Sequence, residues 1–382
     1  MGFPKLSEIL QSDFPSHKRI LFLEGYEGSS NSYAIVGDTV ALIDAANDYT
    51  LFVDLAESGF PPERIATVVL THGHQDHSLG VLELLRQYPR SHGPLEVLLH
   101  KDGPSTLKRM VEELGGSVKE IEDGQQLDLN GFRFEVLHTP GHTIDSVCLF
   151  ERDSKTMFTG DTVITDPGTL PGPDPAARGS STEFLSSLRR LSRIDIRAVC
   201  PGHGAPLRSA GENLVAGTHE QVLRTVIGEK ESWSDAATNL MTQGILEEAI
   251  FCTDKALEQN PGDPSCLEIK ASCLSDLGEL EQALSVFDAL LALERPRPSV
   301  RIGKGYTLLR LERFPESLEC FDEALKDPSA PPEARIGRGL ALIGEGRHDE
   351  AFAIPEFERS FSSELTEEAK RLMESRAARR AS

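Results

Sequence analysis

Short apolar stretches, each bounded by glycine, proline or polar residues, recur along the chain up to about residue 228. Many are rich in β-branched residues, a composition typical of buried strands. The predicted strands cover residues 19–25, 33–36, 40–43, 65–70, 96–99, 147–150, 157–158 and 196–200, with a hairpin over 127–137 that turns at Asn130-Gly131. Helical patterns lie at residues 52–60, from 78 onward, and at 105–114. Strands interleaved with helices indicate an α/β fold class.

The pattern changes near Gly228, beyond which the sequence is helical and repeats itself. Gly244, Gly278 and Gly346 are separated by 34 and 68 residues (278 − 244 and 346 − 278), and Glu312 stands at the skipped step. Other positions keep the same interval: Ala249, Ala283, Ser317 and Ala351; Ala256, Leu290 and Ala324; Phe287 and Phe321. A 34-residue period with small residues at the helix contacts resembles tetratricopeptide repeats (TPR), which are stacked antiparallel helix pairs. Four units fit between residues 230 and 363.

The fourth unit departs from the repeat. Pro355 is expected to break its second helix, and Glu358 replaces a small residue. The polar segment 364–380 is predicted to be a helix that caps the stack. A chain of 382 residues exceeds the usual size of one core. We therefore predict two domains, 1–228 and 229–382, the second of them all-α.

Composition narrows the set of partners. The formal net charge of −22 opposes long-range attraction to DNA or to an anionic membrane, although a local basic patch could still admit RNA as a substrate. No apolar run approaches the ~20 residues of a membrane span, and the first residues lack the apolar core of a secretory signal. The six cysteines form no C-x-x-C pair, so reduced core thiols and a cytoplasmic location are expected.

The segment Thr71-His72-Gly73-His74-Gln75-Asp76-His77 follows the strand predicted at 65–70. It brings three imidazoles and a carboxylate into one turn, and buried polar rings cost free energy unless each finds a partner. Imidazole nitrogens and carboxylate oxygens are also the atoms that hold Zn²⁺ or iron. The segment therefore predicts one wall of a metal site.

Three further candidate ligands lie later in the chain, each after a predicted strand and next to glycine or proline. His142 stands in Thr139-Pro140-Gly141-His142-Thr143, Asp161 in Gly160-Asp161-Thr162, and His203 in Pro201-Gly202-His203-Gly204. Open α/β sheets bind ligands outside the carboxyl ends of their strands. We therefore expect loops at one end of a sheet to present all of these side chains.

The motifs H-x-H-x-D-H, P-G-H-T, G-D-T and P-G-H-G occur here in that order, together with Asn31-Ser32-Tyr33 and Ala41-Leu42-Ile43-Asp44-Ala45 upstream. This set resembles the metallo-β-lactamase superfamily of metallohydrolases, in its glyoxalase II-like or endoribonuclease-like branch. The resemblance implies a four-layer αββα fold, two sheets packed face to face with helices outside, ahead of the TPR-like region.

The resemblance also implies a dinuclear centre. His72, His74 and His142 would hold one ion, Asp76, His77 and His203 the second, and Asp161 would bridge them, which makes Asp76 and Asp161 the expected catalytic carboxylates. Two divalent ions are expected, zinc ahead of iron or manganese. Such ions lower the pKa of a shared water far enough to give hydroxide near neutral pH. The expected reaction is hydrolysis of an ester, thioester or phosphodiester bond in a small molecule or RNA.

Two alternatives stay open at this point. Persulfide dioxygenases share much of this motif set but use a single iron. The repeats are expected to dock a protein or peptide partner, which is compatible with an active hydrolase domain. The stricter alternative is that the protein is only such a scaffold, with the first domain inactive. His74 disfavours the flavodiiron oxygen reductases, which carry glutamate there, and Asp161 disfavours the class B β-lactamases, which lack it.

Three positions have two interpretations each. The Pro- and Gly-rich segment 163–181 follows Asp161, so it is either a lid or specificity loop over the site or a plain surface insertion. His100 ends a predicted strand, where it either lines the pocket or is an ordinary core histidine. Asp44 either hydrogen-bonds a ligand histidine or only fixes its own turn.

Overall fold

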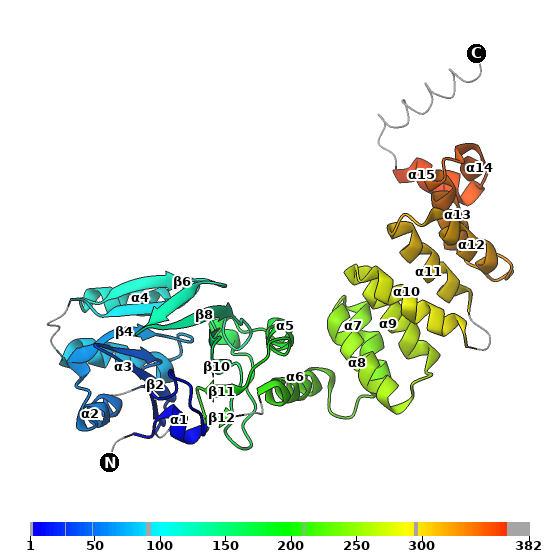
Figure 1. Ribbon diagram of the computed structural model, residues 1–382. Helices are drawn as coiled ribbons and strands as arrows, with labels where there is room; N and C mark the ends of the chain where they lie inside the picture. The colour runs from blue at the N-terminus through cyan, green and yellow to red at the C-terminus, as the bar shows by residue number, and fades with distance from the viewer. Residues whose placement is uncertain are drawn as a thin grey trace. The chain divides into compact units, whose positions relative to one another are not determined.

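The computed structural model describes residues 3–26, 28–47, 49–88, 93–208, 211–293 and 297–364. The chain divides into two compact units, Met1–Glu229 and Lys230–Ser382 (Figure 1). The first unit contains all of the strands of the described residues, and the second contains helices only.

Two six-stranded sheets form the centre of the first unit. The first sheet has the order β1-β2-β3-β4-β5-β6, with β1 Ile20–Leu23, β2 Ser32–Val36, β3 Val40–Ile43, β4 Ile65–Val69, β5 Glu96–His100 and β6 Ser117–Ile121. The second has the order β12-β11-β10-β9-β8-β7, with β7 Gln126–Leu129, β8 Phe132–His138, β9 Val147–Glu151, β10 Thr156–Gly160, β11 Ala198–Pro201 and β12 Leu207–Arg208. Strands β3 to β6 run parallel, as do β10 and β11, and the remaining pairs are antiparallel.

The two faces of the first sheet belong to different cores, because successive side chains of a strand point to opposite sides. Ile20 and Phe22 of β1 join a cluster with Phe134 and Phe158 of the second sheet. Leu21 and Leu23 face the other way and join the cluster formed with helices. These helices are α2 Thr50–Glu57, α3 Gln75–Gln87 and α4 Ser105–Glu113.

Helices α5 (Ser181–Leu191) and α6 (Gly211–Ile227) pack on one another; α5 lies between β10 and β11 in the chain, and α6 follows β12. Helix α5 contacts the loop after β8, because the Ser187 hydroxyl donates to the Pro140 carbonyl (2.7 Å) and an Arg190 guanidinium N–H donates to the His138 carbonyl (3.1 Å). Two face-to-face sheets with helices outside confirm the predicted α/β fold class. Short elements complete the unit: α1 Leu6–Ile9 and the 3₁₀ turns Pro62–Arg64 and Pro175–Ala177.

Local signals located most of these elements, with informative exceptions. The predicted hairpin turns at Asn130 (φ 55°) and Gly131 (φ 86°), the two left-handed residues that a two-residue hairpin requires. Helix α3 begins at Gln75 rather than at the predicted Ser78, because the Asp76 carboxylate suits a helix amino terminus although it breaks the apolar pattern. Strand β6 was not predicted, since this edge strand is mostly exposed and carries few apolar residues.

The second unit consists of helix pairs. The first helices of the pairs are α7 Trp233–Thr242, α9 Pro264–Leu277, α11 Pro298–Arg310 and α13 Pro332–Gly344. The second helices are α8 Leu246–Gln259, α10 Leu280–Leu291 and α12 Phe314–Ala324, with the fourth split into α14 His348–Phe352 and α15 Pro355–Glu364. Pro355 therefore interrupts the last helix as predicted. The predicted cap at 364–380 falls outside the described residues after Glu364.

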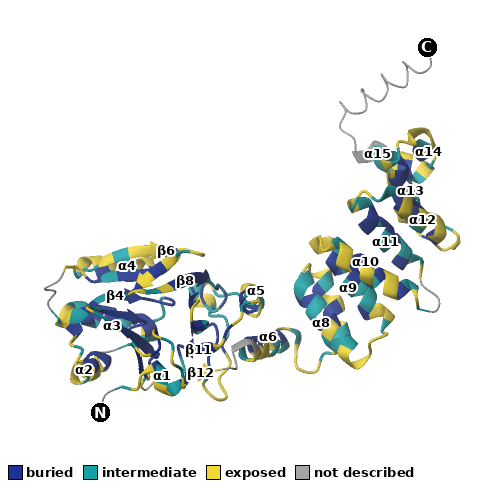
Figure 2. Cartoon of the chain, viewed as in Figure 1, coloured by how far each residue is buried: buried dark blue, intermediate teal, exposed yellow. Residues whose placement is uncertain are grey.

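The 34-residue register of the sequence is also a register of backbone conformation. Gly244, Gly278 and Gly346 have positive φ at the end of a first helix, and Glu312 adopts the same left-handed conformation (φ 59°) at its step. The small residues five positions on are each 0% exposed: Ala249, Ala283, Ser317 and Ala351. Figure 2 shows that the helices of this unit carry buried stretches as well as exposed ones. The predicted helical repeat is confirmed.

Candidate metal centre

The predicted ligands meet where loops from both sheets converge. His72, His74, Asp76 and His77 follow β4 of the first sheet. His142 follows β8, Asp161 follows β10 and His203 follows β11, all in the second sheet. The expectation that one sheet would present every ligand is thus wrong. The two sheets pack against one another through a shared core, so the loops at the strand ends of both sheets meet at the site.

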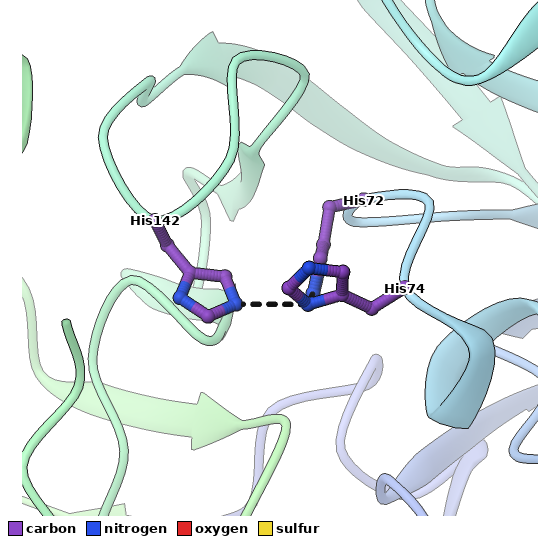
Figure 3. Close-up of side chains that lie close together, drawn as sticks. All are labelled: His72, His74 and His142. Atoms are coloured by element: carbon purple, nitrogen blue, oxygen red, sulfur yellow. Dashed lines mark hydrogen bonds between the residues drawn. The ribbon is translucent and has the colours of Figure 1, made fainter. Parts of the chain in front are cut away.

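His72, His74 and His142 form one compact group, with ligand atoms within 4.8 Å of one another. His74 Nδ1 lies 3.0 Å from His72 Nε2 and 3.1 Å from His142 Nε2. Figure 3 shows the three rings turned toward one another from two separate segments of the chain. This group offers three imidazole nitrogens to a common point.

Asp76, His77, Asp161 and His203 form the second group, again with ligand atoms within 4.8 Å. His77 Nε2 lies 3.3 Å from Asp161 Oδ1, and His203 Nε2 lies 3.1 Å from Asp76 Oδ2. The second carboxylate oxygen of Asp161, Oδ2, lies 3.6 Å from both His203 Nε2 and His142 Nε2. Asp161 therefore stands between the two groups.

Hydrogen bonds at the outer ring nitrogens fix which nitrogen of each histidine faces the centre. His142 Nδ1 donates to the Gly172 carbonyl (2.7 Å), and His74 Nε2 donates to Asp174 Oδ2 (3.0 Å). In the tautomer that these bonds favour, the opposite nitrogen of each ring is turned inward as a possible ligand atom. Such outer partners are typical of metal-bound histidines, because they set the tautomer and orient the ring.

Asp44 holds the third oriented ring. Its Oδ2 accepts from His77 Nδ1 (2.9 Å) and from the Thr71 hydroxyl (2.8 Å), and its Oδ1 accepts from the Thr71 amide (2.8 Å). Asp44 thus contacts a candidate ligand histidine and also fixes the segment that precedes His72, so both interpretations of this residue describe its contacts.

The electrostatics of the cluster depend on a proton held by His77. Burial opposes a charge on this ring, but the carboxylates of Asp161 and Asp44 outweigh burial and raise the pKa of His77 well above 6.5. Burial, reinforced by His77, lowers the pKa of His72 well below 6.5, and burial also lowers that of His142. A cation in the second group would replace the proton of His77, since a metal ligand must be deprotonated.

Small residues and one amide make room for the ligands and hold them. A Cβ at Gly202 would lie 2.4 Å from Asp161 Oδ1 and 2.7 Å from His77 Cε1, so glycine is required there. Asn31 donates to the carbonyls of Pro201 (3.1 Å) and Gly204 (2.7 Å), which flank His203. The upstream Asn31-Ser32-Tyr33 motif therefore positions the last ligand loop.

A cavity of about 490 Å³ opens beside the ligands His142, Asp161 and His203. Its other walls include Ile164, Asp166, Thr169, Leu170, Pro171 and Gly172, all from the 163–181 segment, so this segment lies over the site rather than on a remote surface. His100 is not among the lining residues; it is buried with its ring stacked on His138, at a centroid distance of 4.0 Å. It behaves as a core histidine.

The sequence did not single out Asp174. It lies 100 residues from His74 along the chain, in the stretch Gly172-Pro173-Asp174-Pro175. Such a composition signals only a turn. The only sequence signal for Asp174 was that it is a carboxylate in the loop that follows the predicted ligand Asp161.

The donor set fits a divalent metal. Two buried polar atoms of the second group, His77 Nε2 and Asp161 Oδ1, have no hydrogen-bond partner within the described residues. Buried polar atoms are rarely left so, and these two lie 3.3 Å apart within the second group. Nitrogen and carboxylate donors in this arrangement match the preferences of zinc, iron and manganese.

Two family patterns match the chain. The pattern of the metallo-beta-lactamase superfamily matches residues 25–203, and a tetratricopeptide repeat pattern matches residues 302–354. The chain therefore carries a metallo-β-lactamase superfamily domain in its amino-terminal part and tetratricopeptide repeats in its carboxy-terminal part.

The curated relatives include thioesterases and lactamase-like proteins. An atrochrysone carboxyl ACP thioesterase of Aspergillus fumigatus is 31% identical over 201 residues, which is 49% of this chain and 56% of that protein. A lactamase-like protein of Pestalotiopsis fici is 27% identical over 65% of this chain and 75% of its own length. The chain spans about half the length of the thioesterase relatives it matches.

Among solved structures, a metallo-beta-lactamase family protein from Thermus thermophilus is similar with a TM-score of 0.44 and 20% identity. The match covers 58% of this chain and 87% of that one. No helix of the described residues is both long and apolar enough to cross a bilayer.

Proposed function

We propose that the amino-terminal unit is a metal-dependent hydrolase that holds two divalent ions, zinc as the expected metal, and cleaves an acyl thioester. The observation that carries this proposal is the division of seven donor side chains into two groups with Asp161 between them. Ions bound there would supply a Lewis acid for the substrate carbonyl and lower the pKa of a water molecule toward neutrality.

The residues of the chain have distinct parts in this proposal. His72, His74 and His142 would hold one ion, Asp76, His77 and His203 the other, and Asp161 both. Asp44 keeps a proton on His77 Nδ1, so that Nε2 stays available as a ligand. The loop wall at Ile164, Leu170 and Pro171 would limit the access of water on one side of the cavity.

The names of the relatives favour a thioester over the other bonds that the same chemistry could cleave. The curated thioesterases act, by their names, on an acyl group carried by an acyl carrier protein (ACP). A charge of −22 makes RNA the less favoured substrate. We therefore propose a carrier-bound acyl thioester, with free esters and phosphodiesters as less favoured substrates.

We further propose that the repeat unit docks a protein or peptide partner, since stacked helix pairs present extended binding surfaces. A carrier protein that delivers the thioester is the partner that fits the proposed reaction. The six cysteines, five of them buried, form no disulfide among the described residues, which suits a reducing compartment, so we propose the cytoplasm as the location.

The test is to load the full chain with Zn²⁺, measure metal per chain, and assay acyl-ACP, acyl-CoA, lactone and RNA substrates. We expect two equivalents of zinc and hydrolysis of the thioesters. Asp161→Ala should lower turnover by about 100-fold or more, because losing a metal-bridging carboxylate removes several kcal/mol of transition-state stabilisation. The matched control is Asp195→Ala, which removes an exposed carboxylate paired with Lys155.

The other outcomes select other functions. One iron per chain with consumption of oxygen would replace the hydrolase by a persulfide dioxygenase-like enzyme. No bound metal, with retained binding of a partner protein, would leave a scaffold. Unchanged turnover in Asp161→Ala would contradict the dinuclear mechanism.

A further inference from the structure

The loop between Asp161 and α5 is attached to the three-histidine group at several points. The Gly172 carbonyl accepts from His142 Nδ1 (2.7 Å), and the Asp174 amide donates to the His142 carbonyl (2.8 Å). The Asp174 carboxylate accepts from His74 Nε2 (3.0 Å). One short stretch therefore contacts two of the three ligands of that group.

Asp174 makes hydrogen bonds within its own turn as well as to the ligand histidine His74. Its Oδ1 accepts from the Ala176 amide (2.9 Å), and its carbonyl accepts from the amides of Ala177 (3.1 Å) and Gly179 (2.7 Å). A Cβ at Gly179 would lie 2.3 Å from the His142 carbonyl oxygen, so the turn is closely packed on that ligand segment. A displacement of His74 or His142 would have to move this turn.

The same loop forms a wall of the cavity. Thr169 and Leu170, a few residues before Asp174, line the 490 Å³ cavity at the ligands and also a second hollow of about 730 Å³ that reaches Gln221 and Thr225 of α6. The position of the loop therefore decides the shape of both hollows.

We propose that Asp174 is a positioning residue that couples metal occupancy of the three-histidine group to the placement of the 163–180 loop. The carboxylate fixes His74 with Nδ1 turned inward, which favours metal binding, and bound metal in turn holds His74 and therefore the turn built on Asp174. Such coupling is reciprocal: if loop order strengthens metal binding by a given factor, metal binding favours loop order by the same factor.

The inference deepens the proposed function, because the loop limits the substrate cleft only if that cleft is the site of hydrolysis. The coupling between metal and loop has a readout that needs no substrate. Arg178 is exposed at the tip of this turn, in a left-handed conformation (φ 57°), and Arg178-Gly179 is a bond that trypsin cleaves.

The experiment uses the full chain, freed of metal and then titrated with Zn²⁺ or Co²⁺. Metal affinity is measured by competition with a chelator, and the Co²⁺ absorption spectrum reports the geometry of the ligands. Tryptic cleavage after Arg178 is followed by mass spectrometry with and without metal. Cleavage after Lys119, an exposed-strand site in the same unit, is the internal control.

In the wild type we expect metal to slow cleavage after Arg178 and leave cleavage after Lys119 unchanged. Asp174→Ala should weaken binding of one equivalent of metal by 10- to 100-fold, the usual cost of losing an outer partner of a ligand histidine, and should abolish the protection. Asp174→Asn, which keeps the shape and one acceptor oxygen, should have a smaller effect. Asp195→Ala removes an exposed carboxylate of the same unit that pairs with Lys155, away from the ligands, and should leave the metal affinity unchanged.

Wild-type metal affinity in both Asp174 variants, or metal-independent cleavage after Arg178 in the wild type, would overturn the inference. Because Asp174→Asn is isosteric, it keeps the test decisive if Asp174→Ala fails to fold. Absence of thioester hydrolysis in the wild type would instead remove the proposed function and leave the metal-loop coupling measurable.

Discussion

The two units of this chain differ in where their charged and ionisable side chains lie and in how these side chains are paired. In the repeat unit, three ion pairs between neighbouring helices recur with a separation of 16 residues: Lys270–Asp254, Lys304–Asp288 and Arg338–Asp322. In the amino-terminal unit, Asp44, His72 and His77 are buried, and His77 Nε2 has no hydrogen-bond partner among the described residues. A protein tolerates such unmatched atoms where a ligand completes them.

The two units also differ in what their closely packed glycines contact. The repeat unit is stabilised by large rings packed against very small residues: Phe321 lies so close to Gly305 and Gly337 that an added Cβ would meet its ring within 3 Å. The amino-terminal unit also has a large apolar core, but its close approaches include Gly202 beside Asp161 and His77. Small residues serve helix packing in one unit and ligand placement in the other.

The largest expected effect is a loss of stability in the repeat unit alone. Phe321→Ala should destabilise the repeat unit by about 3–5 kcal/mol, because it leaves a cavity between three helices that cannot close fully. Denaturation followed by the fluorescence of Trp233, the single tryptophan of the chain, reports this unit. The Zn²⁺ content of the folded variant should stay at the wild-type value. Loss of metal would mean that the two units form one folding unit.

A smaller effect is expected in the amino-terminal unit, on metal binding rather than on stability. Asp44→Asn should weaken metal binding by about 10- to 100-fold, since the amide holds His77 less firmly and can present an N–H to it. The Trp233 transition should not move. Asp38→Asn, at an exposed turn of the same unit, is the matched control. Unchanged affinity in Asp44→Asn would show that the ring of His77 is held by packing alone.

The smallest effect concerns pH. His17 is buried between Ser12 and Thr156, and burial lowers its pKa from 6.5. The unfolded chain therefore takes up a proton at His17 as the pH falls through 6.5, whereas the folded chain does not, so stability should decrease below that pH. Metal-free His17→Asn should lose part of this acid sensitivity in the amino-terminal unit. Identical pH profiles of the variant and the wild type would contradict the assignment.

Much of the fold could be predicted because it rests on local periodicity. Short apolar, β-branched stretches located most strands of both sheets. The 34-residue interval located equivalent positions at Gly244, Gly278 and Glu312, which the structure shows to share a left-handed conformation. Helix α3 and strand β6 were misjudged or missed where polar residues hide the period, as at Asp76 in the first turn of α3.

The sequence by itself determined which side chains can act as ligands, because imidazoles and carboxylates at strand ends are recognisable one motif at a time. Only the tertiary structure decided how they divide into two groups, that His74 presents Nδ1 while His142 presents Nε2, and that Asp174 holds His74 across 100 residues of chain. The physical reason is distance along the chain: periodicity reports what neighbouring residues do, whereas a hydrogen bond between remote loops exists only after the sheets have packed.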